Sequence, residues 1–206
     1  KLDTLQKYSK DEEFLATMQS YLTEAKELKD TLSLIKIYDY YVTYFEADET
    51  LYNEKIFLLH KITYLKSHMK RHKKDTALIN DLYRTYFKIA LIHEKTGEVN
   101  AAIDYYYRML FLCEEFEDRQ LEASTQRLIA GAYHYINNTE KAKTHYYKSL
   151  EISRSVGDSN LVFENIFLLG IISYTEGKLS ESATFFFDAL HVAEFLNEDI
   201  LKTLTY

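Results

Sequence analysis

Two histidines, His68 and His72, have the four-residue spacing with which a helix presents two metal ligands on one face. A zinc site needs further imidazole, thiolate or carboxylate ligands. The surrounding run from Lys66 to Lys74 contains five lysines or arginines and no acidic residue, so it supplies no such ligand. We therefore expect no metal site and no cofactor in this chain.

The basic run itself has two other interpretations. It could contact nucleic acid or another anionic surface, as clusters of lysine and arginine do. It could instead be the solvated end of a helix, where cations complement the negative end of the helix dipole. The whole chain carries a net charge of −7, which is unlike a dedicated nucleic-acid binder. The helix-end interpretation is favoured, and nucleic acid is not an expected partner.

No pattern of catalytic residues is visible. The sequence has no phosphate-binding loop, no nucleophile elbow and no metalloprotease helix, and its acidic residues are scattered. The one cysteine, Cys113, lies in an apolar stripe where a packed thiol is expected. It cannot form an internal disulfide, which fits a cytoplasmic location. No apolar run approaches the roughly 20 residues of a membrane helix. We therefore expect neither an enzyme nor a membrane protein.

Aromatic clusters recur every forty residues, at 105–107, 145–147 and 185–187. Each follows a turn signal at the same interval, at Gly97-Glu98, Asn137-Asn138 and Gly177-Lys178. Such a fixed period is typical of a repeat protein. Proline is absent and there are only 5 glycines, so long helices are favoured.

Within each period the apolar residues recur at three- and four-residue steps, which predicts a helical hairpin. In the last copy, the small residues Gly170 and Ser182 allow two helices to approach closely, and Phe186 fills the space beside them. One hairpin cannot bury both of its faces, so the next hairpin is expected to stack on it.

These copies resemble the tetratricopeptide repeat, whose signature pairs W-x2-L-G-x2-Y with A-x3-F. The first half is matched by Tyr86-x2-Ile89-Ala90-x2-His93, Gln126-x2-Ile129-Ala130-x2-Tyr133 and Ile166-x2-Leu169-Gly170-x2-Ser173. The second half is matched by Ala102-x3-Tyr106, Ala142-x3-Tyr146 and Ser182-x3-Phe186. The closing proline is missing, and the period is forty residues instead of thirty-four. Such longer repeats are similar to those of bacterial regulatory and sensory tetratricopeptide proteins.

The resemblance implies an all-α, right-handed α-solenoid that occupies residues 1–206 as one domain. The expected hairpins are 31–73, 80–117, 120–156 and 160–196, with partial hairpins at both ends. At the C-terminal end, residues from Asp199 to Tyr206 repeat the opening of a first helix.

In this family the first helix of each hairpin lines a concave groove that holds the ligand. The matching positions here combine cations, which suit a carboxylate or an acidic peptide, with aromatic side chains, which suit apolar groups. The predicted groove residues are Lys36, Tyr40, Arg84, Phe87, Lys88, Arg127, His134, Tyr135, Phe167 and Tyr174. Chaperone-binding members grip a C-terminal carboxylate with lysine, asparagine and arginine, but the corresponding positions here are Phe87, Leu91, Leu128, Glu164 and Leu168. A cochaperone is therefore disfavoured.

The sequence as a whole predicts a scaffold that binds a peptide or protein segment. By the resemblance, it would be the sensory or regulatory module of a larger cytoplasmic bacterial signalling protein with an appended output domain. Two alternatives stay open: a purely structural scaffold for protein assembly, and an adaptor that uses the basic run.

Overall fold

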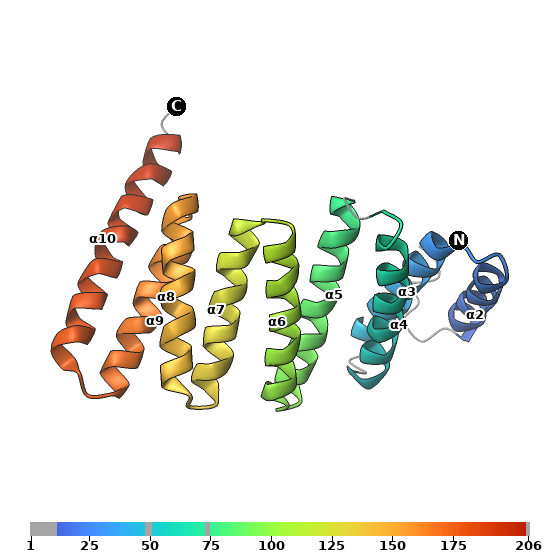
Figure 1. Ribbon diagram of the computed structural model, residues 1–206, viewed down its shortest axis with the longest axis horizontal. Helices are drawn as coiled ribbons and strands as arrows, with labels where there is room; N and C mark the ends of the chain where they lie inside the picture. The colour runs from blue at the N-terminus through green and yellow to red at the C-terminus, as the bar shows by residue number, and fades with distance from the viewer. Residues whose placement is uncertain (1–11, 48–50, 73–74, 205–206) are drawn as a thin grey trace. The chain divides into compact units, whose positions relative to one another are not determined.

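The computed structural model describes residues 12–47, 51–72 and 75–204, and Figure 1 shows them as helices joined by short turns. These residues contain nine helices and no strand, so the all-α prediction is confirmed. The chain divides into two compact units, residues 1–97 and 98–206. The segment 73–74, which ends the basic run, lies outside the described residues.

The described residues of the first unit form four helices, each of which packs on the next. They are α2 (Glu12–Glu27), α3 (Thr31–Ala47), α4 (Leu51–Met69) and α5 (Thr76–Lys95). Stacked aromatic rings join them. Tyr41 of α3 lies 4.3 Å from Phe57 of α4, and Phe14 of α2 lies 5.0 Å from Tyr44 of α3, between ring centroids. These aromatic residues lie outside the clusters that recur every forty residues at 105–107, 145–147 and 185–187.

The second unit continues the same up-and-down packing (Figure 1). Its helices are α6 (Val99–Glu115), α7 (Arg119–Tyr135), α8 (Thr139–Val156), α9 (Ser159–Thr175) and α10 (Leu179–Leu204). Neighbours in sequence are neighbours in space, and α7 also contacts α9. That arrangement is typical of repeat proteins, in which each hairpin buries a face on the next.

The predicted turns are confirmed by the backbone. Gly97, Asn137 and Gly177, forty residues apart, have φ values of +78°, +59° and +77°. This left-handed conformation carries little cost for glycine and is tolerated by asparagine. Asp158 caps the N-terminus of the next helix, at 159–175, because its carboxylate accepts a hydrogen bond from Leu161 N. Asp118 caps the helix at 119–135 in the same way, through Leu121 N.

The recurring aromatic positions fill the seams between helices as predicted. Tyr106 and Tyr146 are buried, and Phe186 is half-buried against α9. A Cβ built on Gly170 would lie 2.8 Å from Cε1 of Phe186, so the ring occupies the space that a side chain would need. Beside it, Ser182 Oγ donates a hydrogen bond to the carbonyl oxygen of Gly170 at 2.9 Å.

The last helix differs from its predicted end. We expected a break before Asp199, but α10 runs without interruption from Leu179 to Leu204. The sequence at 197–198 lacks the glycine that turns the chain at Gly157, so nothing forces the helix to stop. Leu190 is 52% exposed on α10, whereas its equivalents Leu110 and Leu150 are each 7% exposed.

Candidate binding surfaces

A buried lysine holds three helices of the first unit together. The Lys61 side chain on α4 is 5% exposed, and its Nζ lies 2.6 Å from Asp81 Oδ1 on α5 and also donates to Asp39 Oδ1 on α3. Burial raises the pKa of Asp39, although the Lys61 ammonium opposes the shift. Because the lysine is fully engaged by two carboxylates, this triad is a structural link, and the Lys61 ammonium is not free for a ligand.

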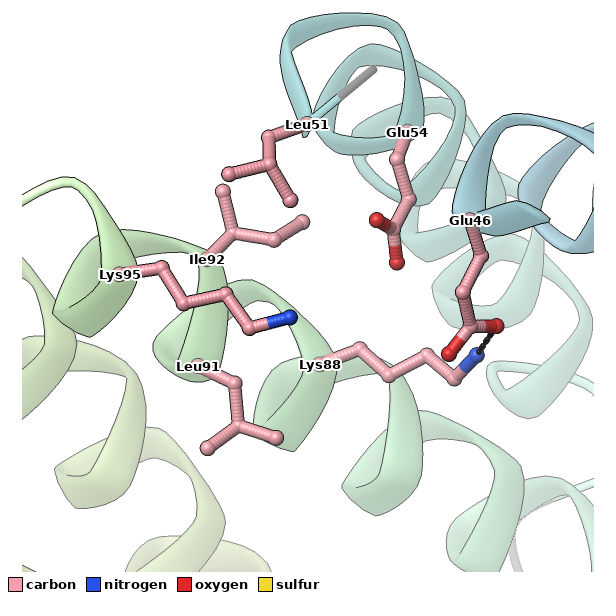
Figure 2. Close-up of a pocket in the computed structure, with 7 residues that line it drawn as sticks. All are labelled: Glu46, Leu51, Glu54, Lys88, Leu91, Ile92 and Lys95. Carbon is pink, nitrogen blue, oxygen red and sulfur yellow. Dashed lines mark hydrogen bonds and ion pairs between the residues drawn. The ribbon is translucent and has the colours of Figure 1, made fainter. Parts of the chain in front are cut away.

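A cavity of about 380 Å³ opens in the first unit. Figure 2 shows that α3, α4 and α5 all contribute to it. Glu46 comes from the end of α3, Leu51 and Glu54 from the start of α4, and Lys88, Leu91, Ile92 and Lys95 from α5. Lys88 Nζ and Glu46 Oε2 form an ion pair at 2.7 Å. The cavity thus combines two carboxylates, two ammonium groups and an aliphatic wall.

The predicted groove residues of the first unit do not form one site. Lys88 lines the cavity, whereas Lys36 and Tyr40 line a separate shallow hollow between α2 and α3. Arg84 is exposed on α5, and Phe87 is half-buried. Sequence analysis did not select Glu54, because a lone glutamate in a second helix has no motif around it. The burial of Glu54 could have been inferred from Leu58, an aliphatic residue four positions later on the same helix face.

The predicted residues of the second unit lie on α7 and α9, the two first helices that contact each other. We call Arg127, His134, Tyr135, Phe167 and Tyr174 the α7–α9 surface. Its aromatic members are open to solvent, with Tyr135 at 74% and Tyr174 at 62% exposed.

Two members of the α7–α9 surface are already engaged within the protein. The Arg127 Nε lies 3.0 Å from Glu164 Oε2 and so joins α7 to α9. Phe167 stacks on Phe163 at 5.9 Å and touches the ring of Phe186 at 5.5 Å between centroids. The guanidinium that was predicted to hold a ligand carboxylate is therefore paired with a glutamate of the neighbouring helix.

A polar network lies in the interior of the second unit. His145 Nδ1 and Gln126 Oε1 are 2.6 Å apart, and His145 Nε2 and the Tyr107 hydroxyl are 3.0 Å apart. Since the amide oxygen only accepts, Nδ1 carries the proton and the Tyr107 hydroxyl donates to Nε2. Burial, together with the charges of Lys148 and Lys141, lowers the pKa of His145 to about 4. The imidazole is thus a neutral link between α6, α7 and α8.

The remaining candidate residues show no arrangement for catalysis or metal binding. His68 and His72 stack with their rings 4.5 Å apart, and no group of three potential metal ligands occurs in the part of the chain that the structure describes. Cys113 is buried, and burial raises the pKa of its thiol to about 11. The basic residues Lys66, Lys70 and Arg71 are exposed, as expected for a helix end. Among the described residues, no helix has the length and apolar character to cross a membrane.

The stacked hairpins, their left-handed turns at a forty-residue interval and their open first helices define a helical-repeat protein. Residues 81–155 match the family model of the tetratricopeptide repeat, so this part of the chain contains tetratricopeptide repeats. No curated protein sequence matches it.

Solved structures of low sequence identity have the same fold. One is a putative kinesin light chain with TPR-like repeats from Podosopora anserina, with 11% identity, a TM-score of 0.66, and 93% of this chain and 91% of that chain covered. The apo form of RapI gives 15% identity, a TM-score of 0.64 and coverage of 90% and 65%. A Rap protein complexed with Competence and Sporulation Factor has 14% sequence identity and a TM-score of 0.55. The match covers 86% of this chain and 53% of that chain. The chain therefore spans about two thirds of RapI and half of the other Rap protein.

Proposed function

We propose that this protein is a peptide-binding regulatory module that holds an extended segment against its first helices. The observation that carries the proposal is the exposure of Tyr135 and Tyr174 on neighbouring first helices. Large aromatic side chains of this kind supply much of the binding energy at protein interfaces. No catalytic role is assigned to any residue.

The fold supports this function because a repeat array presents successive helices as one extended binding surface. The similarity to a Rap protein complexed with Competence and Sporulation Factor points in the same direction. A regulatory setting in a larger cytoplasmic bacterial protein, with an output domain on the same chain, is part of the proposal. In that setting a bound segment would favour one arrangement of the hairpins over another and so control the output.

Selection of peptides from a random display library on the full chain tests the proposal. Enriched peptides are then titrated against the wild type and a double variant, Tyr135→Ser/Tyr174→Ser. We expect the double variant to bind about tenfold or more weakly, as for loss of interface hot spots. Tyr52→Ser is the matched control, since Tyr52 is equally open on α4 but not on a first helix.

Two results would contradict the proposal. Equal affinity for the double variant and the wild type would remove the α7–α9 surface from the binding site. Failure to enrich any peptide above an unrelated helical protein would favour the alternative, a scaffold that contacts only folded partners.

A further inference from the structure

The cavity of the first unit contains a carboxylate that no side chain of the described residues pairs with directly. Glu54 is 5% exposed, and among the described residues it forms neither a hydrogen bond nor an ion pair. Figure 2 shows its carboxylate directed into the cavity, apart from the Lys88–Glu46 pair. A carboxylate with so little exposed surface is stabilised when a cationic donor enters beside it.

A second unpaired charge faces Glu54 across the same cavity. The Lys95 side chain extends from α5 with its Nζ pointing into the cavity, and it has no ion pair within the described part of the chain (Figure 2). Leu51, Leu91 and Ile92 supply the apolar wall of the cavity. The cavity therefore offers an acceptor for a cation, a donor for an oxygen and a surface for an aliphatic side chain.

We propose that this cavity binds the free amino-terminal residue of a peptide, with the ammonium on Glu54 and the first carbonyl oxygen on Lys95. The aliphatic wall then takes an apolar first side chain such as that of leucine. The inference rests on the proposed peptide-binding function and names the end of the peptide that is recognised. The volume of about 380 Å³ suits one terminal residue, since it lies at the small end of the range for ligand sites.

Other occupants fit the charges less well. A ligand carboxylate would meet the carboxylates of both Glu54 and Glu46. A neutral amide would bring no positive charge to Glu54. A lysine side chain offers the same ammonium but no carbonyl group at the distance of an α-amino acid, so Lys95 would stay unpaired.

The ionisation of Glu54 supports the geometry. Burial raises the pKa of Glu54, the charge of Glu46 raises it further, and Lys88 and Lys95 oppose the shift. A bound ammonium stabilises the ionised form, so binding lowers that pKa and the affinity must fall as Glu54 becomes protonated. The other charged groups that face Glu54 in the cavity are Glu46, Lys88 and Lys95.

Small probes test the inference on the full chain without knowledge of the natural peptide. The probes are L-leucinamide, N-acetyl-L-leucinamide and N-acetyl-L-lysine methylamide, titrated by NMR at neutral pH. We expect leucinamide to bind saturably and the acetylated probe to bind about tenfold or more weakly, because acetylation removes the cation. The lysine probe should also bind more weakly than leucinamide.

A matched pair of variants assigns the effect to Glu54. Glu54→Gln keeps the shape and removes the charge, so it should weaken leucinamide binding about tenfold or more. Glu94→Gln makes the same change at an exposed position of α5 and should leave binding unchanged. If Glu54→Gln does not fold, the comparison of free and acetylated leucinamide on the wild type still decides the question.

The inference is overturned if leucinamide fails to bind, if the acetylated probe binds equally, or if folded Glu54→Gln binds like the wild type. Equal binding of the lysine probe would also overturn the assignment to an amino terminus. The proposed function would still be tested separately by the library peptides. If their affinity still falls in the Tyr135→Ser/Tyr174→Ser variant, the protein binds peptides but does not recognise their amino terminus in this cavity.

Discussion

At the scale of single residues, the buried His145 couples the stability of the second unit to pH. Its pKa of about 4 in the folded protein lies below the ordinary value of 6.5, so the unfolded chain binds the proton more readily. The stabilisation is complete above pH 6.5 and is lost as the pH falls from 6.5 toward 4. The difference of 2.5 pH units corresponds to at most about 3 kcal/mol.

We therefore expect His145→Gln to reduce this pH dependence. The glutamine does not titrate, so the free energy of unfolding of the variant should change less with pH across that window. Denaturant titrations at several pH values from about 7 to about 4 measure the difference. His191→Gln is the control, because His191 is exposed on α10 and takes no part in this network. Parallel profiles for wild type and His145→Gln would contradict the assigned neutral link.

At the scale of the elements, the contact between α9 and α10 depends on the absence of a side chain at Gly170. An alanine Cβ there would lie 2.8 Å from Phe186 and 3.2 Å from Phe185 Cβ. We expect Gly170→Ala to lower the free energy of unfolding by about 1–3 kcal/mol through overpacking. In contrast, a Cβ on Gly131 of α7 would meet only the Tyr146 hydroxyl, at 3.7 Å.

Gly131→Ala is therefore the control for overpacking, and it should be neutral or stabilising by up to about 1 kcal/mol because alanine favours a helix. Thermal or denaturant unfolding of the two variants gives the comparison. Equal effects of the two substitutions would show that helix propensity, and not the close approach of α9 and α10, dominates at Gly170.

The repeat also provides a matched pair of leucines. Leu150 and Leu190 occupy the same position of successive second helices, but among the described residues a following hairpin covers only Leu150. Leu150→Ala should cost about 2–5 kcal/mol, as for a buried leucine. Leu190→Ala should cost about 0.5 kcal/mol or less, as for an exposed position. A large loss for Leu190→Ala would mean that another molecule or chain segment covers this face of α10 in solution.

At the scale of the whole molecule, the chain divides into two compact units, which need not lose stability together. In repeat proteins, stability is close to a sum of local terms and contacts between neighbours. We expect Leu150→Ala to increase amide hydrogen exchange throughout α6 to α10 and to change α3 and α4 little. Hydrogen exchange followed by mass spectrometry resolves the two regions. A uniform increase along the chain would indicate one cooperative unit instead.

The sequence predicted the fold because the forty-residue repetition gives the same signal three times. Turns at Gly97, Asn137 and Gly177 and fillers at Tyr106 and Tyr146 were all identified from spacing. The predicted groove residues were positions carried over from a family. Such positions indicate which residues lie on the first helices, but they do not show which side chains pair with one another. The pairing of Arg127 with Glu164 and the continuation of α10 through Asp199 were therefore not foreseen.

What the sequence determined by itself is the all-α hairpin architecture, since periodicity, turns and small residues are local properties that adjacent hairpins reinforce. Only the tertiary structure decided where the charges are free and where they are neutralised. In the sequence, Lys61, Glu54 and Lys95 are all charged residues within helices, and nothing distinguishes their roles. Packing joins Lys61 to two aspartates and, among the described residues, leaves Glu54 and Lys95 facing each other without an ion pair. Desolvation and pairing depend on residues that come together only when several helices pack, so no local pattern could assign them.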